Sequence, residues 1–178
     1  MRIRAELIAS QFHAALSMLA ECVEKCPPEH WDAKPPYVVG EQPFWMVAYH
    51  TLCFVDCYMA ANNERFEAEI GQRKPGFHPA GMKELSEEFP SRRFERDEIR
   101  PYVEFCRDRV RSVLEGETEP TLAGASGFSW LDISRGELHL YNLRHLSHHT
   151  GQLTAFLRRV GVETKWVKAG WRVTQPQP

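Results

Sequence analysis

Apolar residues recur at intervals of three and four along four long segments of this sequence, and that spacing places them on one face of an α-helix. The predicted helices cover about residues 3–25, 43–66, 95–114 and 135–160. No segment has the alternating pattern of a half-buried strand. The sequence therefore predicts an all-α fold, a four-helix bundle with long connections after the second and third helices.

The length of 178 residues predicts a single domain, residues 1–178, with one hydrophobic core. Hydrophobic residues make up 43% of the chain and charged residues 26%, which is the composition of a globular protein rather than a disordered one. Gly161 is a candidate cap for the last helix. The tail, residues 162–178, contains two tryptophans, so we expect part of it to pack and the final QPQP to be loose.

The charge balance argues against nucleic acid as a partner. The formal net charge is −2, and the most basic stretch, SRRFERDEIR at residues 91–100, interleaves acids with its bases. The first residues lack the apolar core of a signal peptide, and no apolar run is long enough to span a membrane. We therefore expect a cytoplasmic protein that does not bind membranes.

The five cysteines are an odd number, and we expect reduced thiols. Cys22 and Cys26 are four residues apart, as are Cys53 and Cys57, so each pair shares one face of a helix. Either pair could form half of a metal site. The favoured interpretation is that these cysteines are small buried apolar side chains.

Three of the eight histidines fall within the stretch RHLSHHTGQL, residues 144–153. At about 100° per residue, His145 and His149 share one flank of the apolar face of the last predicted helix, one turn apart. His148 lies on the opposite side, toward solvent or a neighbouring chain. The spacing therefore selects two of the three histidines for a shared role.

His50 lies in the middle of the apolar face of the second predicted helix, where each ring nitrogen needs a partner. We hypothesise that His50, His145 and His149 bind one divalent metal ion, since neutral imidazole is the commonest nitrogen ligand. Three protein ligands leave positions free for water or substrate, as in a catalytic site. The alternatives are hydrogen-bonded core histidines, or a site that Cys53 or Cys57 also joins. Zinc, nickel, copper and iron all suit such a site.

These motifs resemble those of the DinB/YfiT-like superfamily. HLSHHTGQL is similar to its last-helix signature H-x-x-H-H-x-G-Q-[LI], MVAYHTLCFVD to its second-helix block, and WDAKPP…PFW to the segment before that block. The resemblance implies a four-helix bundle with a three-histidine metal centre made of His50, His145 and His149. It also implies a homodimer. Characterised relatives include thiol-S-transferases and a thiol-dependent isomerase that use bacillithiol or mycothiol.

The sequence departs from the family pattern at two positions beside the predicted ligands. Leu146 stands where many relatives have glutamate, and Thr150 where many have arginine. Neither change removes a ligand, but substrate contacts cannot be transferred from relatives. Gln152 lies on the His145 flank, either as an exposed side chain or as a hydrogen-bond donor that supports the ligands.

The resulting functional hypothesis is a metal-dependent transferase that joins a low-molecular-weight thiol to an electrophilic small molecule. The alternatives are a hydrolase that uses metal-activated water and a non-catalytic metal-binding stress-response protein. We expect the loop at residues 126–133, with Trp130, to form the rim of the site. No catalytic residue is assigned, because Asp56 is rotated away from His50 and Asp132 lies on a loop that the sequence does not place.

Overall fold

The chain folds into helices throughout the part that the structure describes. This computed structural model describes residues 2–34, 42–70, 76–85 and 90–172, and these contain no β-strand. The all-α prediction is confirmed for these residues. The elements in order are α1 (Arg2–Lys25), the short 3₁₀ helix η1 (Pro28–His30), α2 (Phe44–Met59), α3 (Asn63–Ile70), the 3₁₀ helix η2 (Gly81–Leu85), α4 (Arg96–Gly116), α5 (Glu119–Ala123) and α6 (Arg135–Arg159).

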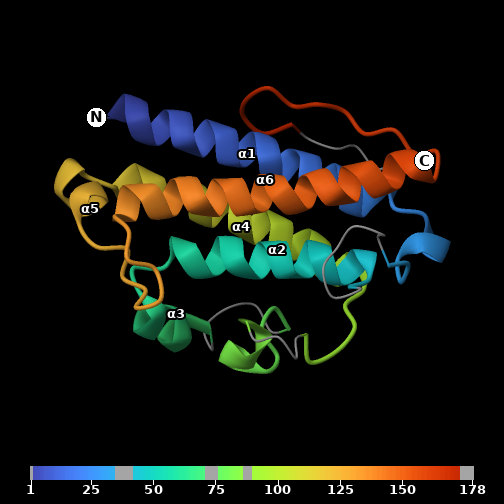
Figure 1. The fold of residues 1–178 in the computed structure, drawn as a ribbon, viewed down its shortest axis with the longest axis horizontal. Coiled ribbons are helices and arrows are strands. Elements are labelled where there is room, and N and C mark those ends of the chain that lie inside the picture. The colour runs from blue at the N-terminus through green and yellow to red at the C-terminus, as the bar shows by residue number, and fades with distance from the viewer. Residues whose placement is uncertain (1, 35–41, 71–75, 86–89, 173–178) are drawn as a thin grey trace.

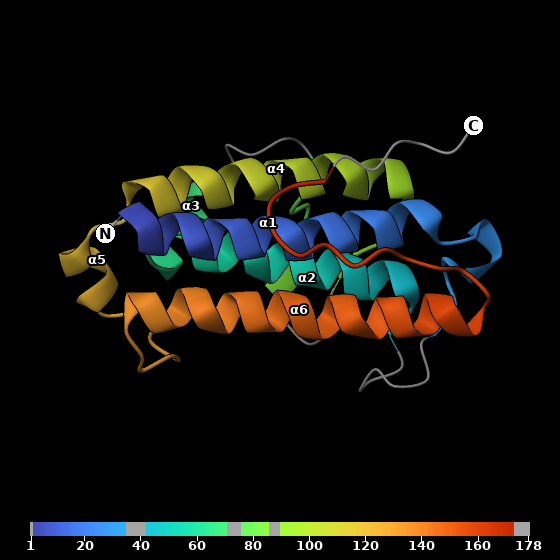
Figure 2. The same cartoon turned by 90° about the horizontal axis from the view of Figure 1, so that it is seen from above.

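The four long helices α1, α2, α4 and α6 lie side by side (Figures 1 and 2). α1 packs against α4 and α6, and α2 packs against the same two helices. Their apolar faces meet in one buried cluster, to which the four helices contribute residues such as Leu16, Leu52, Val103 and Leu153. Burial of this surface is the main term that stabilises the fold. None of the described helices is long and apolar enough to cross a bilayer.

The predicted second helix, residues 43–66, is wrong at its end, because the structure contains two helices there. α2 stops at Met59, Ala60 has an extended backbone with φ −72° and ψ 159°, and α3 starts at Asn63. The side chain of Asn62 accepts a hydrogen bond from the backbone N–H of Arg65 at 2.7 Å, which caps the first turn of α3. Apolar periodicity continues across this break and therefore did not reveal it.

A buried arginine caps the end of α2. Arg135, the first residue of α6, donates hydrogen bonds to the carbonyl oxygens of Tyr58, Met59 and Ala60 at 3.3, 3.4 and 2.6 Å. The last carbonyls of a helix have no partner within it, and their negative dipole favours a cation. Arg135 therefore joins the start of α6 to the end of α2.

Glu117, just after α4, compensates the buried charge of Arg135. One of its carboxylate oxygens accepts hydrogen bonds from Arg135 Nε at 2.9 Å and His139 Nε2 at 2.8 Å, and the other accepts one from Thr121 at 2.6 Å. Burial raises the pKa of Glu117, but the hydrogen bonds from His139, Thr121 and Arg135 outweigh it and lower the pKa to about 2. Glu117 therefore stays ionised as the counter-charge of Arg135.

The connections contain more helix than expected. The long connection before α6 includes α5, which the sequence did not predict, and α4 continues to Gly116. The connection between α3 and α4 includes the 3₁₀ helix η2, while residues 86–89 of this connection lie outside the described part. The predicted cap at Gly161 is confirmed, because its φ of +81° lets Val162 donate a hydrogen bond to Leu157 at 2.8 Å.

The tail follows α1, as Figure 2 shows. The backbone N–H of Lys165 donates to Glu21 at 3.0 Å, and that of Arg172 donates to Ser17 at 2.8 Å. Trp171 packs against the core, whereas Trp166 is 75% exposed. The expectation that part of the tail packs is confirmed, and the QPQP segment lies outside the described residues.

We predict that Arg135→Met lowers the free energy of unfolding by about 3–5 kcal/mol, because it leaves buried carbonyls and the Glu117 carboxylate without their partner. Urea denaturation measures this value. Arg158→Met changes an exposed arginine of the same helix and should alter the free energy by no more than about 0.5 kcal/mol. Equal effects of the two substitutions would contradict the capping role of Arg135.

The low pKa of Glu117 predicts acid sensitivity of the fold. Its folded pKa of about 2 lies below the ordinary 4.5, so the carboxylate stabilises the protein above pH 4.5. This contribution, about 3 kcal/mol, is lost as the pH falls from about 5 to 2. Urea denaturation across this range should show that the free energy of unfolding depends less on pH in Glu117→Gln than in wild type. Glu115→Gln, an exposed change on α4, should keep the wild-type profile.

Candidate metal centre

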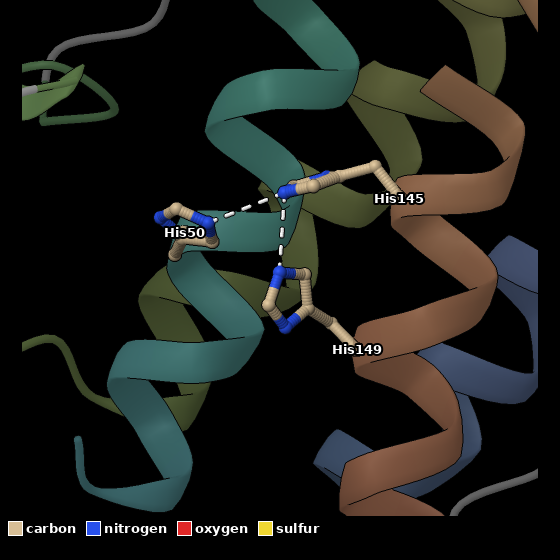
Figure 3. A group of neighbouring side chains, drawn as sticks. All are labelled: His50, His145 and His149. Atoms are coloured by element: carbon tan, nitrogen blue, oxygen red, sulfur yellow. Dashed lines mark hydrogen bonds between the residues drawn. The ribbon is translucent and has the colours of Figure 1, made fainter. Parts of the chain in front are cut away.

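Three histidines from two helices meet between α2 and α6 (Figure 3). His145 Nε2 lies 3.3 Å from His50 Nε2 and 3.1 Å from His149 Nε2. One nitrogen from each ring lies within 4.8 Å of the other two, and all three residues are half-buried. The structure thus brings together the three residues that helical spacing selected, while metal binding itself stays a prediction.

Local helix geometry explains the arrangement. His145 and His149 are one turn apart and project from the same face of α6 toward α2, which supplies His50 (Figure 3). His148 is exposed and lies outside this group, as its position on the opposite side of the helix predicted. Two residues of the site are therefore fixed by one helix, and the third depends on how the helices pack.

The three rings are neutral at physiological pH. Burial lowers the pKa of His50 to about 4, with a smaller effect of His149. Burial also lowers the pKa of His145 to about 3, assisted by its neighbours His149 and His50, and it lowers the pKa of His149. Only a neutral imidazole has a free lone pair, so the burial that lowers these pKa values keeps the rings in their metal-binding form.

The geometry of the cluster suits a divalent transition-metal ion. A neutral imidazole has one N–H and one lone pair, so three Nε2 atoms that face one another cannot all be satisfied by hydrogen bonds among themselves. A central cation gives each lone pair a partner. For tetrahedral zinc with Zn–N bonds of about 2.0–2.1 Å, ligand nitrogens lie about 3.3 Å apart, close to the observed 3.3 and 3.1 Å.

Gln152 orients one of the rings. Its side-chain oxygen lies 2.8 Å from Nδ1 of His149, on the opposite side of the ring from the cluster. An N–H at Nδ1 donates to this oxygen and leaves the lone pair of Nε2 facing the other two histidines. Gln152 therefore supports a candidate ligand, as one of the two interpretations held, but it accepts the hydrogen bond from His149, while its side-chain nitrogen lies 3.2 Å from Nε2 of His148.

The cysteines do not join this cluster. Among the described residues, His50, His145 and His149 form the only group of three or more histidine, cysteine or acidic side chains close enough to share an ion. All five cysteines are buried and free of disulfides. Burial raises the pKa of Cys22 and of Cys26 to about 12, and it raises that of Cys53 well above its ordinary value. They are buried apolar side chains, as the favoured interpretation held.

Asp56 is engaged elsewhere, as its rotation away from His50 predicted. It is fully buried, with Arg109 Nε at 2.9 Å, the hydroxyl of Tyr102 at 3.2 Å and Nε2 of His78 at 3.4 Å. This network fastens α4 and the segment before η2 to α2. Asp56 therefore cannot act as a base at the histidine cluster. Asp132 is exposed and is also outside the cluster.

One neighbour of the cluster was missed at the sequence level. The ring of Phe54 lies 4.8 Å from the ring of His50 and 5.2 Å from that of His145, measured between centroids. Its position four residues after His50 is the signal that could have revealed it. The predicted rim loop reaches α2 farther along, where Phe128 meets Tyr58 at 5.3 Å.

Known proteins resemble this chain in sequence pattern and in fold. The family model described as the DinB superfamily matches residues 11–153, a span that includes all three histidines. The crystal structure of YjoA, a DinB-like protein from Bacillus subtilis, has a similar fold, with a TM-score of 0.61 and 18% sequence identity. The similarity covers 93% of this chain and 99% of that one. A comparison with curated proteins gave no match.

We predict a graded loss of zinc affinity across four proteins, measured by competition with a chromophoric chelator. His145→Ala removes a ligand and should bind zinc more than about 100-fold less tightly than wild type. Gln152→Leu keeps all three ligands but removes the support of His149, together with the contact to His148, and should cost about 10–100-fold. Ser147→Ala, an exposed change on the same helix, should bind as wild type does. Equal affinities in wild type and His145→Ala would contradict the site.

Proposed function

The chain belongs to the DinB superfamily, and we propose that it is an enzyme that binds a divalent metal ion through His50, His145 and His149. The observation that carries this proposal is the convergence of three neutral imidazole nitrogens within 4.8 Å of one another, with both distances from His145 close to the spacing of tetrahedral ligands. Three protein ligands leave at least one coordination position for another molecule. This arrangement is typical of catalytic rather than structural sites.

We infer that the reaction is the transfer of a small thiol to an electrophilic substrate. When bound, a divalent ion lowers the pKa of a coordinated thiol and so supplies a nucleophile near neutral pH. The residues of the chain hold and shield this position: Gln152 fixes the ring of His149, and Phe54 covers one side of His50 and His145. The five buried cysteines offer no exposed thiol, so the nucleophile comes from a separate molecule.

The surroundings of the cluster favour thiol transfer over hydrolysis. Hydrolysis of most substrates uses an acid or base to move protons to and from the reacting groups. Among the described residues, no carboxylate shares the histidine cluster, and Asp56 is bound to Arg109. A thiol that is ionised by the metal needs no such base. Hydrolysis by metal-activated water and a non-catalytic role of the metal remain the alternatives, and a cytoplasmic homodimer remains our expectation.

A thermal-shift measurement tests the thiol. We predict that cysteine or glutathione raises the melting temperature of the zinc-loaded protein, since a ligand at 100 times its Kd adds about 2.7 kcal/mol to the free energy of unfolding. Serine, which has an oxygen in place of the sulfur of cysteine, is the matched control and should give no shift. His145→Ala should not respond to either thiol. If the zinc-loaded wild type binds neither thiol, the non-catalytic alternative is favoured.

A further inference from the structure

A continuous strip of aromatic side chains begins at the histidine cluster. The strip consists of Phe54, Tyr58, Phe128, Trp130 and Tyr141. Phe54 contacts both His50 and His145, and its ring lies 5.5 Å from that of Tyr58. From Tyr58 the strip divides, reaching Tyr141 at 5.7 Å in one direction and Phe128 at 5.3 Å in the other, and Phe128 reaches Trp130 at 5.3 Å.

Two of the five side chains of the strip are buried, and the other three are partly accessible to solvent. Tyr58 and Phe128 are 3% and 2% exposed, whereas Phe54 and Tyr141 are half-buried and Trp130 is 51% exposed. The buried pair fixes the others, and the remaining three rings keep accessible area. Aromatic rings in such an arrangement can stack with another planar group, a contact that stabilises binding beyond the burial of apolar area.

Trp130 is held in place by the loop that carries it. Ser126 donates a hydrogen bond to the carbonyl of Leu131 at 2.7 Å and accepts one from the backbone of Phe128 at 3.1 Å. Gly127 has a φ of +87°, and a Cβ there would lie 2.1 Å from the carbonyl oxygen of Ala61. A loop that is fixed by its own hydrogen bonds and packs this closely loses little entropy when a ligand contacts Trp130.

A cation borders the strip. The guanidinium carbon of Arg144 lies 5.3 Å from the ring centroid of Tyr141, and Arg144 is exposed. Its positive charge attracts an anionic or neutral aromatic compound and repels a cationic one. Tyr58 lies eight residues after His50, about 12 Å along α2, so a compound with two linked rings can follow the strip from the cluster toward Trp130.

We propose that the substrate is an aromatic compound whose planar group lies along this strip, while its reactive group lies at the histidine cluster. This inference rests on the proposed function, because it places the reacting atoms beside the bound metal. The substrate class that fits is a neutral or anionic aryl electrophile. Phe54, Trp130 and Tyr141 would then determine specificity through their contacts with the rings.

Hydroxamates that bind zinc test the proposal without measuring turnover. Isothermal titration calorimetry compares acetohydroxamate with biphenyl-4-hydroxamate on the zinc-loaded protein, and the ratio of the two Kd values isolates the contribution of the rings. We expect a ratio of at least tenfold in wild type and about one-tenth of that ratio in Trp130→Ala. Trp166→Ala removes another exposed tryptophan, outside the strip, and should keep the wild-type ratio. Equal melting temperatures of the three proteins show that folding is unaffected.

The possible results distinguish a failure of the aromatic strip from a failure of the metal site. A wild-type ratio near one, or a ratio that Trp130→Ala leaves unchanged, would overturn the aromatic strip as the substrate site and leave the metal site intact. Failure of both hydroxamates to bind zinc-loaded wild type would instead overturn the open coordination position, and with it the proposed function. An equal fall of the ratio in Trp166→Ala would also overturn the inference.

Discussion

The packing of α2 against α6 brings the three candidate metal ligands together. The contact is fixed at one end by Arg135, which binds the last carbonyls of α2, and along its length by Asn142, which donates to the carbonyl of Val55 at 3.3 Å. A slip of one helical turn would move the helices by about 5.4 Å, more than a coordination distance. His50 would then no longer reach the two histidines of α6.

Two buried ionic networks support α2. Glu117 pairs with Arg135 and His139 at the end of this helix, and Asp56 pairs with Arg109 in its last turn. Buried charges are costly unless they are paired and hydrogen-bonded, so each network fits only one arrangement of the helices. Both carboxylates are thus engaged away from the histidines, and none among the described residues shares the histidine cluster. The residues that secure the fold thereby limit the chemistry that the site can perform.

The site combines low polarity with neutral ligands. Burial beside Phe54 lowers the pKa of His50 and of His145, which keeps their lone pairs available over the physiological pH range. Because no carboxylate among the described residues shares the cluster, the proposed reaction is one that a bound ion could initiate alone, the ionisation of a thiol. The neighbouring rings continue the apolar surface away from the histidines, and the proposed aromatic substrate rests on this continuity.

Rules that apply within a single helix were sufficient to predict much of this structure. The period of 3.6 residues located the long helices, put His145 and His149 on one face and His148 on another, and placed Asp56 away from His50, since these relations lie within single helices. The family motif also lies mostly within one such segment. Gly161 could be assigned as a cap because a left-handed backbone conformation at the end of a helix favours glycine.

Only the tertiary structure decided where α2 ends, since the arginine that caps it lies about 75 residues farther along the chain. It also decided that His50 meets the two histidines of α6, that Gln152 accepts from His149, and that Phe54 and Trp130 belong to one aromatic strip. Periodicity describes the faces of each helix but not which faces meet. Those contacts join residues far apart in the sequence, and they are set by packing and by the pairing of buried polar groups.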